Sequence, residues 1–142
     1  MATINPYVNF DGNAEEAFNL YKSVFGGEFA TVQRFKDSPE AARVKPQDQD
    51  KMMHIALPIG KDNMLMATDA LDYMGHSYKE GNNFSISVTA DSQNEAEKIF
   101  NGLSSGGKVS VPFSKAIWGS YFGMLTDKFG MQWMVSHDPN RK

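Results

Sequence analysis

The sequence predicts an α+β fold made of two similar βαβββ modules, and three observations support this prediction. In each half of the chain a strand-like stretch, Tyr7–Phe10 or Phe84–Val88, comes before a polar turn and an amphipathic helical pattern. The two copies align at one common offset, which matches Ala17 with Ala96. Three further strand-like runs follow each helical pattern. Two long copies indicate two supersecondary modules rather than a solenoid of three or more repeats. Paired half-domains commonly enclose a cleft, so a ligand pocket is expected.

The length of the chain fits a single domain. We predict that residues 1–142 form one domain with a core of ordinary size. Module one is expected at about 1–69, a polar loop at 70–83 and module two at about 84–138.

Composition narrows the possible functions. The net charge of −3 provides no basic field for nucleic acid, so no nucleic-acid partner is expected. The chain has no cysteine, which excludes disulfides, thiolate metal sites and cysteine nucleophiles. No apolar run approaches the roughly 20 residues of a membrane span, and no signal peptide is recognisable. We predict a cytoplasmic protein with no membrane partner.

The first module has clear boundary signals. Its helix is expected to begin after Asn13, whose side-chain oxygen is a typical N-cap, and to end at Gly26–Gly27. The polar, proline-containing residues 36–51 read as a mobile loop or lid. The remaining strands of this module are expected at Phe29–Phe35, Met52–Ile59 and Met64–Thr68.

The second module repeats this order. Ser92 is expected to cap a helix at about Asn94–Leu103, which ends in a Ser-Ser-Gly-Gly run. Its later strands are expected at Lys108–Phe113, Ala116–Leu125 and Met131–Val135.

Two long motifs carry a resemblance to a known family. The residues Tyr7–Ala17, with Tyr21 and Phe25–Gly27, resemble the start of the PhnB-like branch of the glyoxalase/bleomycin-resistance/dioxygenase group, also called the vicinal oxygen chelate superfamily. Residues Trp118–Trp133 are similar to the other signature of this family. The resemblance spans nearly the whole chain. It implies paired βαβββ modules, with curved mixed sheets around a cavity, and a homodimer.

Members of this family are often labelled demethylubiquinone methyltransferases, and the residues argue against that activity here. A methyltransferase that uses S-adenosylmethionine typically has a glycine-rich turn after its first strand. The paired glycines at 26–27 and 106–107 instead follow helical patterns, where glycine ends a helix. We therefore reject this reading and expect no cofactor.

The resemblance also implies where a metal ion would be held, namely on the first and last strands of each module. The residues at these positions are Tyr7 or Asn9, Phe84 or Ser85, Met66 or Leu65, and Met134 or Gln132. None is a histidine or carboxylate, which divalent ions of this class prefer. We therefore predict that the protein has no metal site.

The histidines and one carboxylate leave alternatives open. His54 and Asp69 match positions that are common in the family. We favour a core or pocket role for His54 over a metal ligand, because structural zinc needs four ligands. A role as general base, with Asp69 as partner, stays open, although a carboxylate after a strand is more often a turn or cap residue. His76 lies in the polar loop, and His137 is expected just beyond the last strand.

An aromatic and thioether lining is the alternative to a metal site. Methionine, with nine residues, suits an adaptable apolar pocket but is also a common core residue. Trp118 stands beside Gly119 on an expected strand, either as a stacking wall for a planar ligand or as an anchor in a dimer interface.

The leading hypothesis is a metal-independent protein that binds a small apolar or aromatic molecule in a preformed cavity. Its pocket residues are predicted to be Tyr7, Asn9, His54, Met66, Asp69, Trp118, Phe122 and Met134. The alternatives are a metal-dependent lyase, isomerase or dioxygenase, and an interaction module whose cleft closes in a dimer.

Overall fold

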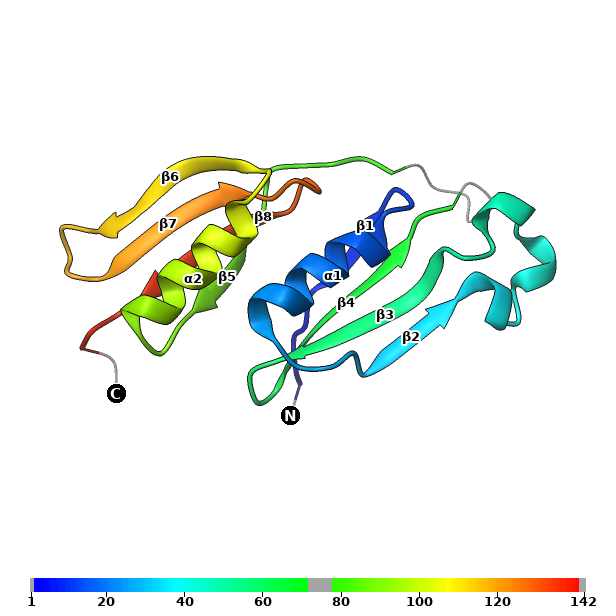
Figure 1. Ribbon diagram of the computed structural model, residues 1–142, viewed down its shortest axis with the longest axis horizontal. Helices are drawn as coiled ribbons and strands as arrows, with labels where there is room; N and C mark the ends of the chain where they lie inside the picture. The colour runs from blue at the N-terminus through cyan, green and yellow to red at the C-terminus, as the bar shows by residue number, and fades with distance from the viewer. Residues whose placement is uncertain (1, 72–77, 141–142) are drawn as a thin grey trace. The chain divides into compact units, whose positions relative to one another are not determined.

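The computed structural model describes residues 2–71 and 78–140, which form two compact units divided between Lys79 and Glu80. Each unit has a four-stranded mixed sheet and one α-helix, so the predicted α+β class and the βαβββ repeat are confirmed (Figure 1). The division between the units falls within the segment that was predicted to connect the modules.

The sheet of the first unit has the strand order β1-β4-β3-β2. The central pair is antiparallel, whereas β1 runs parallel to β4 and places Tyr7 beside Met66. The elements of this unit are β1 (Tyr7–Phe10), α1 (Ala14–Phe25), β2 (Thr31–Arg34), β3 (Met52–Ile59) and β4 (Asn63–Asp69).

Helix α1 covers one face of this sheet (Figure 1). Its buried side chains are Ala14, Ala17, Phe18 and Tyr21, at the spacing of one helical face. The ring of Phe18 meets that of Phe10 edge to face, with centroids 6.2 Å apart. Because strand side chains alternate between faces, β1 directs Val8 and Phe10 to the helix and Tyr7 and Asn9 to the opposite face.

The segment predicted as a loop at 36–51 has local structure of its own. It contains three 3₁₀ turns, at Phe35–Asp37, Ala41–Arg43 and Pro46–Asp48. The Gln49 side-chain amide donates to the carbonyls of Ala41 and Val44. Phe35, Val44 and Leu71 form a small buried cluster against which Met53 packs.

The second unit repeats the architecture with the strand order β5-β8-β7-β6. Helix α2 buries Ala96, Ile99, Phe100 and Leu103, and the Ser92 side chain caps it by accepting from the Glu95 amide at 3.0 Å, as predicted. The elements are β5 (Ile86–Thr89), α2 (Gln93–Ser104), β6 (Lys108–Lys115), β7 (Tyr121–Thr126) and β8 (Gln132–His137).

Several predicted boundaries were wrong. Phe35 begins a 3₁₀ turn instead of ending β2, and Phe84 comes before β5 instead of starting it. Trp118 lies in the turn between β6 and β7, not on a strand, and His137 is the last residue of β8, not beyond it. At Phe35, Phe84 and Trp118 apolar side chains continue past the hydrogen-bonded ladder, and at His137 the ladder continues past the apolar residues, so hydropathy alone does not mark the end of a strand.

Gly123 of β7 shows which face of the second sheet meets the helix. A Cβ atom at this position would lie 2.7 Å from the Phe100 ring of α2 and 2.9 Å from the Phe113 Cα of β6. Gly123 therefore lies on the helix side, and its neighbours Phe122 and Met124 lie on the opposite face.

We expect Gly123→Ala to lower the free energy of unfolding by about 1–3 kcal/mol, because the added methyl group overpacks a site bounded partly by backbone. Urea denaturation measures this change. Gly81→Ala is the matched control, since its Cβ would meet nothing closer than 3.8 Å. Equal stability of the two variants would contradict the close approach of α2 to β7.

Candidate functional site

The helix-free face of the first sheet brings four of the predicted pocket residues together. Tyr7 and Met66 are register partners on β1 and β4, and Met66 is also paired with Ala56 of β3. Asn9 pairs with Thr68 in the same way. The ring of His54 stacks on that of Tyr7, with centroids 5.8 Å apart and planes 28° apart. Tyr7, Asn9, Met66 and His54 therefore share one face.

These residues combine flat apolar surface with the hydrogen-bonding groups of a phenol, an amide and an imidazole. Tyr7 is 51% exposed, so about half of its surface is accessible. A tyrosine hydroxyl donates and accepts, and an imidazole carries one donor and one acceptor when neutral. This face can orient a small ligand by hydrogen bonds and contact it with ring and thioether surface.

The helix-free face of the second sheet carries Phe122 and Met134. Phe122 pairs with Ser136, while Met124 pairs with Met134, which in turn pairs with Ser87 of β5. Because the adjacent Gly123 and Val135 lie on the helix side, Phe122, Met124 and Met134 form an apolar row on the opposite face.

Trp118 extends this row from the turn between β6 and β7. Its side chain is 66% exposed, and its ring centroid lies 5.6 Å from that of Phe122 at an interplanar angle of 42°. The turn is closed by a hydrogen bond from the Gly119 amide to the Ala116 carbonyl, and Gly119 has φ 97°, a conformation that favours glycine. The turn thus fixes where the indole is held.

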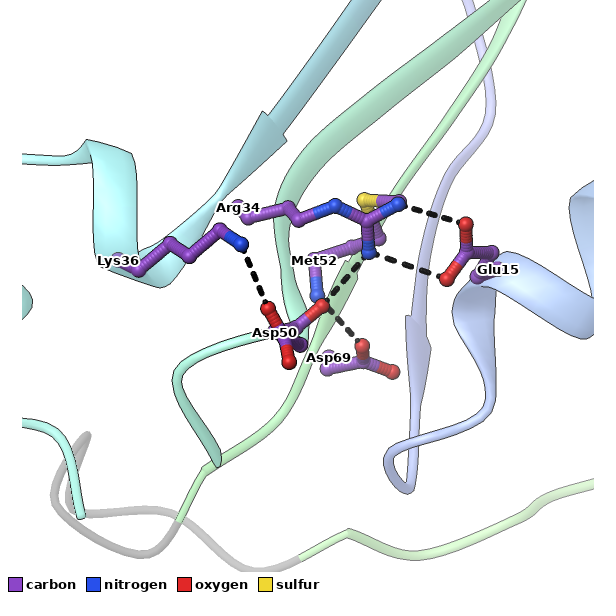
Figure 2. Close-up of polar contacts among 6 residues, drawn as sticks. All are labelled: Glu15, Arg34, Lys36, Asp50, Met52 and Asp69. Carbon is purple, nitrogen blue, oxygen red and sulfur yellow. Dashed lines mark hydrogen bonds and ion pairs between the residues drawn. The ribbon is translucent and has the colours of Figure 1, made fainter. Parts of the chain in front are cut away.

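Asp69 lies on the other side of the first sheet, apart from Tyr7, Asn9 and His54. Its side chain is 1% exposed, and one of its oxygens accepts a hydrogen bond from the Ala14 amide at 3.0 Å. The other oxygen accepts from the Met52 amide at 2.8 Å (Figure 2). Asp69 therefore satisfies an amide at the start of α1 and fixes the start of β3. Asn13 is the N-cap residue of α1, as predicted, but its side chain makes no capping hydrogen bond, so the predicted capping contact was wrong.

Burial raises the pKa of the Asp69 carboxyl, because removal from water disfavours its charged form. The hydrogen bonds from the Met52 and Ala14 amides and the charge of Lys51 act in the opposite direction and are outweighed. With both oxygens occupied by backbone amides, Asp69 is a structural residue and not an acid–base partner of His54.

A group of charged side chains connects α1, β2 and the segment before β3. Arg34 donates to both carboxylate oxygens of Glu15, at 2.7 and 3.0 Å, and to the Asp50 carbonyl at 2.8 Å (Figure 2). Lys36 pairs with the Asp50 carboxylate at 2.9 Å. Strand alternation places Arg34 on the helix side, opposite to Gln33, and an extra residue of β3 makes Met52 its register partner. No local sequence signal identified Glu15 as the partner of Arg34, because the two residues lie 19 positions apart along the chain.

A polar cavity of about 380 Å³ lies beside this charged group. It is lined by Gly12, Asn13, Glu15, Glu16, Asn19, Gln47, Asp50, Lys51, Met52 and Asp69. Of the predicted pocket residues, Asp69 alone lines it. The cavity is therefore distinct from the surface that carries Tyr7 and His54.

His137, the other histidine among the described residues, has a structural role. His137 uses its Nδ1 atom in a contact of 3.0 Å with the Ala90 carbonyl, which holds the end of β8 against the segment after β5. His76 lies outside the described residues. Within residues 2–71 and 78–140, no group of three His, Asp or Glu side chains is placed to hold a metal ion.

The fold defines the class of protein first. Both units match a glyoxalase/bleomycin resistance protein from Albidiferax ferrireducens T118 with a TM-score of 0.63 over 95% of this chain and 98% of that one, at 14% identity. That likeness supports the glyoxalase/bleomycin-resistance fold and nothing finer.

The family follows from the sequence comparison. The model of the family described as 3-demethylubiquinone-9 3-methyltransferase matches residues 2–136, so the chain belongs to this PhnB-like family. Protein PA1353 from Pseudomonas aeruginosa is 39% identical over 97% of this chain and 98% of its own, with a TM-score of 0.87. A PhnB protein from Bacillus cereus is 26% identical over 96% of this chain and 99% of its own, with a TM-score of 0.77.

The methyl donor that the family description implies does not fit the residues after the first strand. Gly12 is the glycine between β1 and α1, and Lys51 donates to its carbonyl at 2.8 Å. A Cβ at Gly12 would lie 3.1 Å from the Lys51 Nζ, so this side chain occupies the approach to the turn. Asp69, the acid at the end of the adjacent strand, is engaged by two amides. We therefore derive no methyl-transfer step.

Among the described residues, no helix is long and apolar enough to span a membrane.

We expect Asp69→Asn to lower the free energy of unfolding by about 1–3 kcal/mol, because an amide offers one acceptor oxygen where two buried N–H groups need partners. Chemical denaturation measures the loss. Asp62→Asn, in the exposed turn between β3 and β4, is the control and should change stability little. If Asp69→Asn were as stable as the control, the structural role of this carboxylate would be wrong.

We expect Glu15→Gln to reduce stability by roughly 0.5–1 kcal/mol near pH 7, the usual size for a partly exposed ion pair. The Arg34 guanidinium lowers the pKa of the Glu15 carboxyl through its hydrogen bonds. The stabilisation is therefore fully present above the ordinary value of about 4.5 and is lost as pH falls through the lowered pKa.

Denaturation curves between pH 7 and pH 3 test this dependence. The difference between the wild-type protein and Glu15→Gln should become smaller toward the acid end. Glu16→Gln, one residue along the same helix, is the control and should show no such pH-dependent difference. A difference that stayed the same size from pH 7 to pH 3 would rule out the ion pair as its source.

Proposed function

We propose that this protein binds a small apolar or aromatic molecule on the helix-free faces of its sheets, without a metal ion. The observation that supports the proposal best is the placement of ring pairs on these faces. Tyr7 and His54 stack on the first sheet, and Trp118 lies against Phe122 at the second. The proposal includes that a cavity between the modules encloses the ligand, and this part rests on the sequence repeat.

The two faces supply different contacts. On the first, Tyr7, Asn9 and His54 provide hydrogen-bonding groups beside the Met66 thioether. On the second, Phe122, Met124 and Met134 provide apolar surface that adapts to irregular shapes. A mainly apolar lining with a few polar groups is the usual design of small-molecule sites.

The charged residues of the described chain favour binding without a metal over a metal-dependent lyase, isomerase or dioxygenase. A catalytic zinc typically needs three protein ligands. Among the described strand positions of the helix-free faces, His54 is the only residue of a type that such metal ions prefer. Met66 and Met134 lie at positions where the superfamily resemblance implies metal ligands.

A homodimer is also part of the proposal, since the resemblance implies one and exposed aromatic side chains are typical interface anchors. In that case Trp118 either contacts the ligand or packs against the second copy. A pure interaction module, which is the third alternative, would leave Trp118 buried in the dimer and unaffected by small molecules.

Titration of the protein with 2-naphthol, an uncharged planar probe at pH 7, tests the proposal. The two tryptophan indole N–H signals in a ¹H–¹⁵N spectrum separate the possible sites, because Trp118 is exposed and Trp133 is 1% exposed and bonded to Asp127. We expect the Trp118 signal to shift and that of Trp133 to stay in place. Prior dialysis against EDTA should leave the titration unchanged.

Trp118→Ala should weaken binding by about 1 kcal/mol, or roughly fivefold, as expected for one lost aromatic contact. Ile117→Ala is the control, because Ile117 is fully exposed in the same turn and makes no ring contact. Calorimetry gives both affinities. An affinity lost on chelation, or a saturable titration that leaves Trp118 unmoved, would contradict the proposed function.

A further inference from the structure

The helix-free face of the first sheet lacks charged side chains at its paired strand positions, although 22% of the chain is charged. The register connects its positions across all four strands: Asn9 with Thr68, Tyr7 with Met66, Met66 with Ala56, Ala56 with Thr31, and His54 with Gln33. The polar groups among them are neutral amides, hydroxyls and one imidazole.

The corresponding face of the second sheet has the same character. Ser87, Ser136 and Gln132 accompany Phe122, Met124 and Met134 on this face. The exception is Lys108, which pairs with Thr126 at the start of the edge strand β6. It is six residues along that strand from Ser114, the partner of Phe122, which corresponds to roughly 20 Å.

The charges near the first sheet lie on its other side. Alternation along β2 turns Arg34 away from the face of Gln33 and His54 and toward Glu15 of α1, and Asp69 points to the same helix. The absence of charge from the helix-free face is thus built into the strand geometry.

We propose that the ligand of this protein is an uncharged planar aromatic compound that carries neutral hydrogen-bonding groups, such as hydroxyl or carbonyl oxygens. Carboxylates, phosphates, sulfonates and quaternary ammonium compounds are selected against. This inference rests on the proposed function and names the chemical class of its ligand. It holds for each face separately, because the first face has no charged residue at its paired positions and Lys108 of the second lies roughly 20 Å along β6 from the partner of Phe122.

The physical reason is the cost of removing a charge from water. A charged group that enters an apolar surface needs an opposite charge or several hydrogen bonds to offset its lost hydration. Neither face offers a carboxylate or a guanidinium at its paired positions. A hydroxyl or carbonyl costs much less and finds partners in Tyr7, Asn9 and His54.

A cationic ligand is a separate case, because aromatic rings attract positive charge. Strong ammonium sites surround the cation with several rings. Here Trp118 and Phe122 form one tilted pair, and the Tyr7 and His54 rings stack on each other. Neither arrangement encloses a cation, so these ring pairs favour a ligand with a flat, uncharged ring surface.

Calorimetric titration of the whole protein at pH 7 with three probes of one ring system tests the inference. The probes are 2-naphthol, 2-naphthalenesulfonate and a naphthalene that carries a trimethylammonium group. We expect both charged probes to bind at least about tenfold more weakly than 2-naphthol, which corresponds to about 1.4 kcal/mol. The Trp118 indole signal reports whether each probe occupies the same site.

A charge introduced on the face provides a second, independent test. Ser87 is exposed and pairs with Met134, so Ser87→Lys adds a cation beside the apolar row. We expect this variant to bind 2-naphthalenesulfonate about fivefold more tightly and 2-naphthol within about twofold of the wild-type protein. Asn94→Lys, on the exposed side of α2, adds the same charge elsewhere and should change neither affinity by more than about twofold.

The outcomes separate the two proposals. If none of the three probes binds, the proposed function is wrong. If either charged probe binds as tightly as 2-naphthol and shifts Trp118 equally, binding stands and the inference of a neutral ligand is wrong. A Ser87→Lys variant that left the preference unchanged would also contradict the inference.

Discussion

Successive side chains of β4 point alternately into the interior of the first unit and to its helix-free face. Ala67 and Asp69 face helix α1, whereas Met66 and Thr68 face the other way. Because β1 pairs with β4 in parallel, Tyr7 and Asn9 lie on the same face as their partners Met66 and Thr68. The rest of the structure depends on this register, because it decides which side chains form the core and which remain for a ligand.

The Asp69 carboxylate holds this register in place. By accepting from the amides of Ala14 and Met52, it joins the end of β4 to the starts of α1 and β3. Arg34 reinforces the same corner through Glu15 and the Asp50 carbonyl (Figure 2). Ionic and hydrogen-bonding groups thus concentrate on the helix side of this sheet, where they organise the fold, and the other face carries rings, thioethers and neutral polar groups.

Much of the fold was predictable because apolar periodicity and helix signals are local. Both helices and the order of the strands follow from them, as does the Ser92 cap. The capping of α1 was not predictable, since Asp69 lies 55 residues along the chain from Ala14. The grouping of Tyr7, Asn9, Met66 and His54 on one face agrees with strand alternation, whereas the turn position of Trp118 depends on where the β6–β7 ladder stops.

The alternation along β2 has a consequence for how this scaffold can change. Gln33 pairs with His54 on the helix-free face, and Arg34, the next residue, lies on the helix side. Deletion of Gln33 would place the arginine opposite His54 and turn its guanidinium to the other surface. The loss of one codon would convert a neutral surface into a cationic one, and with it change the class of molecules that the scaffold attracts.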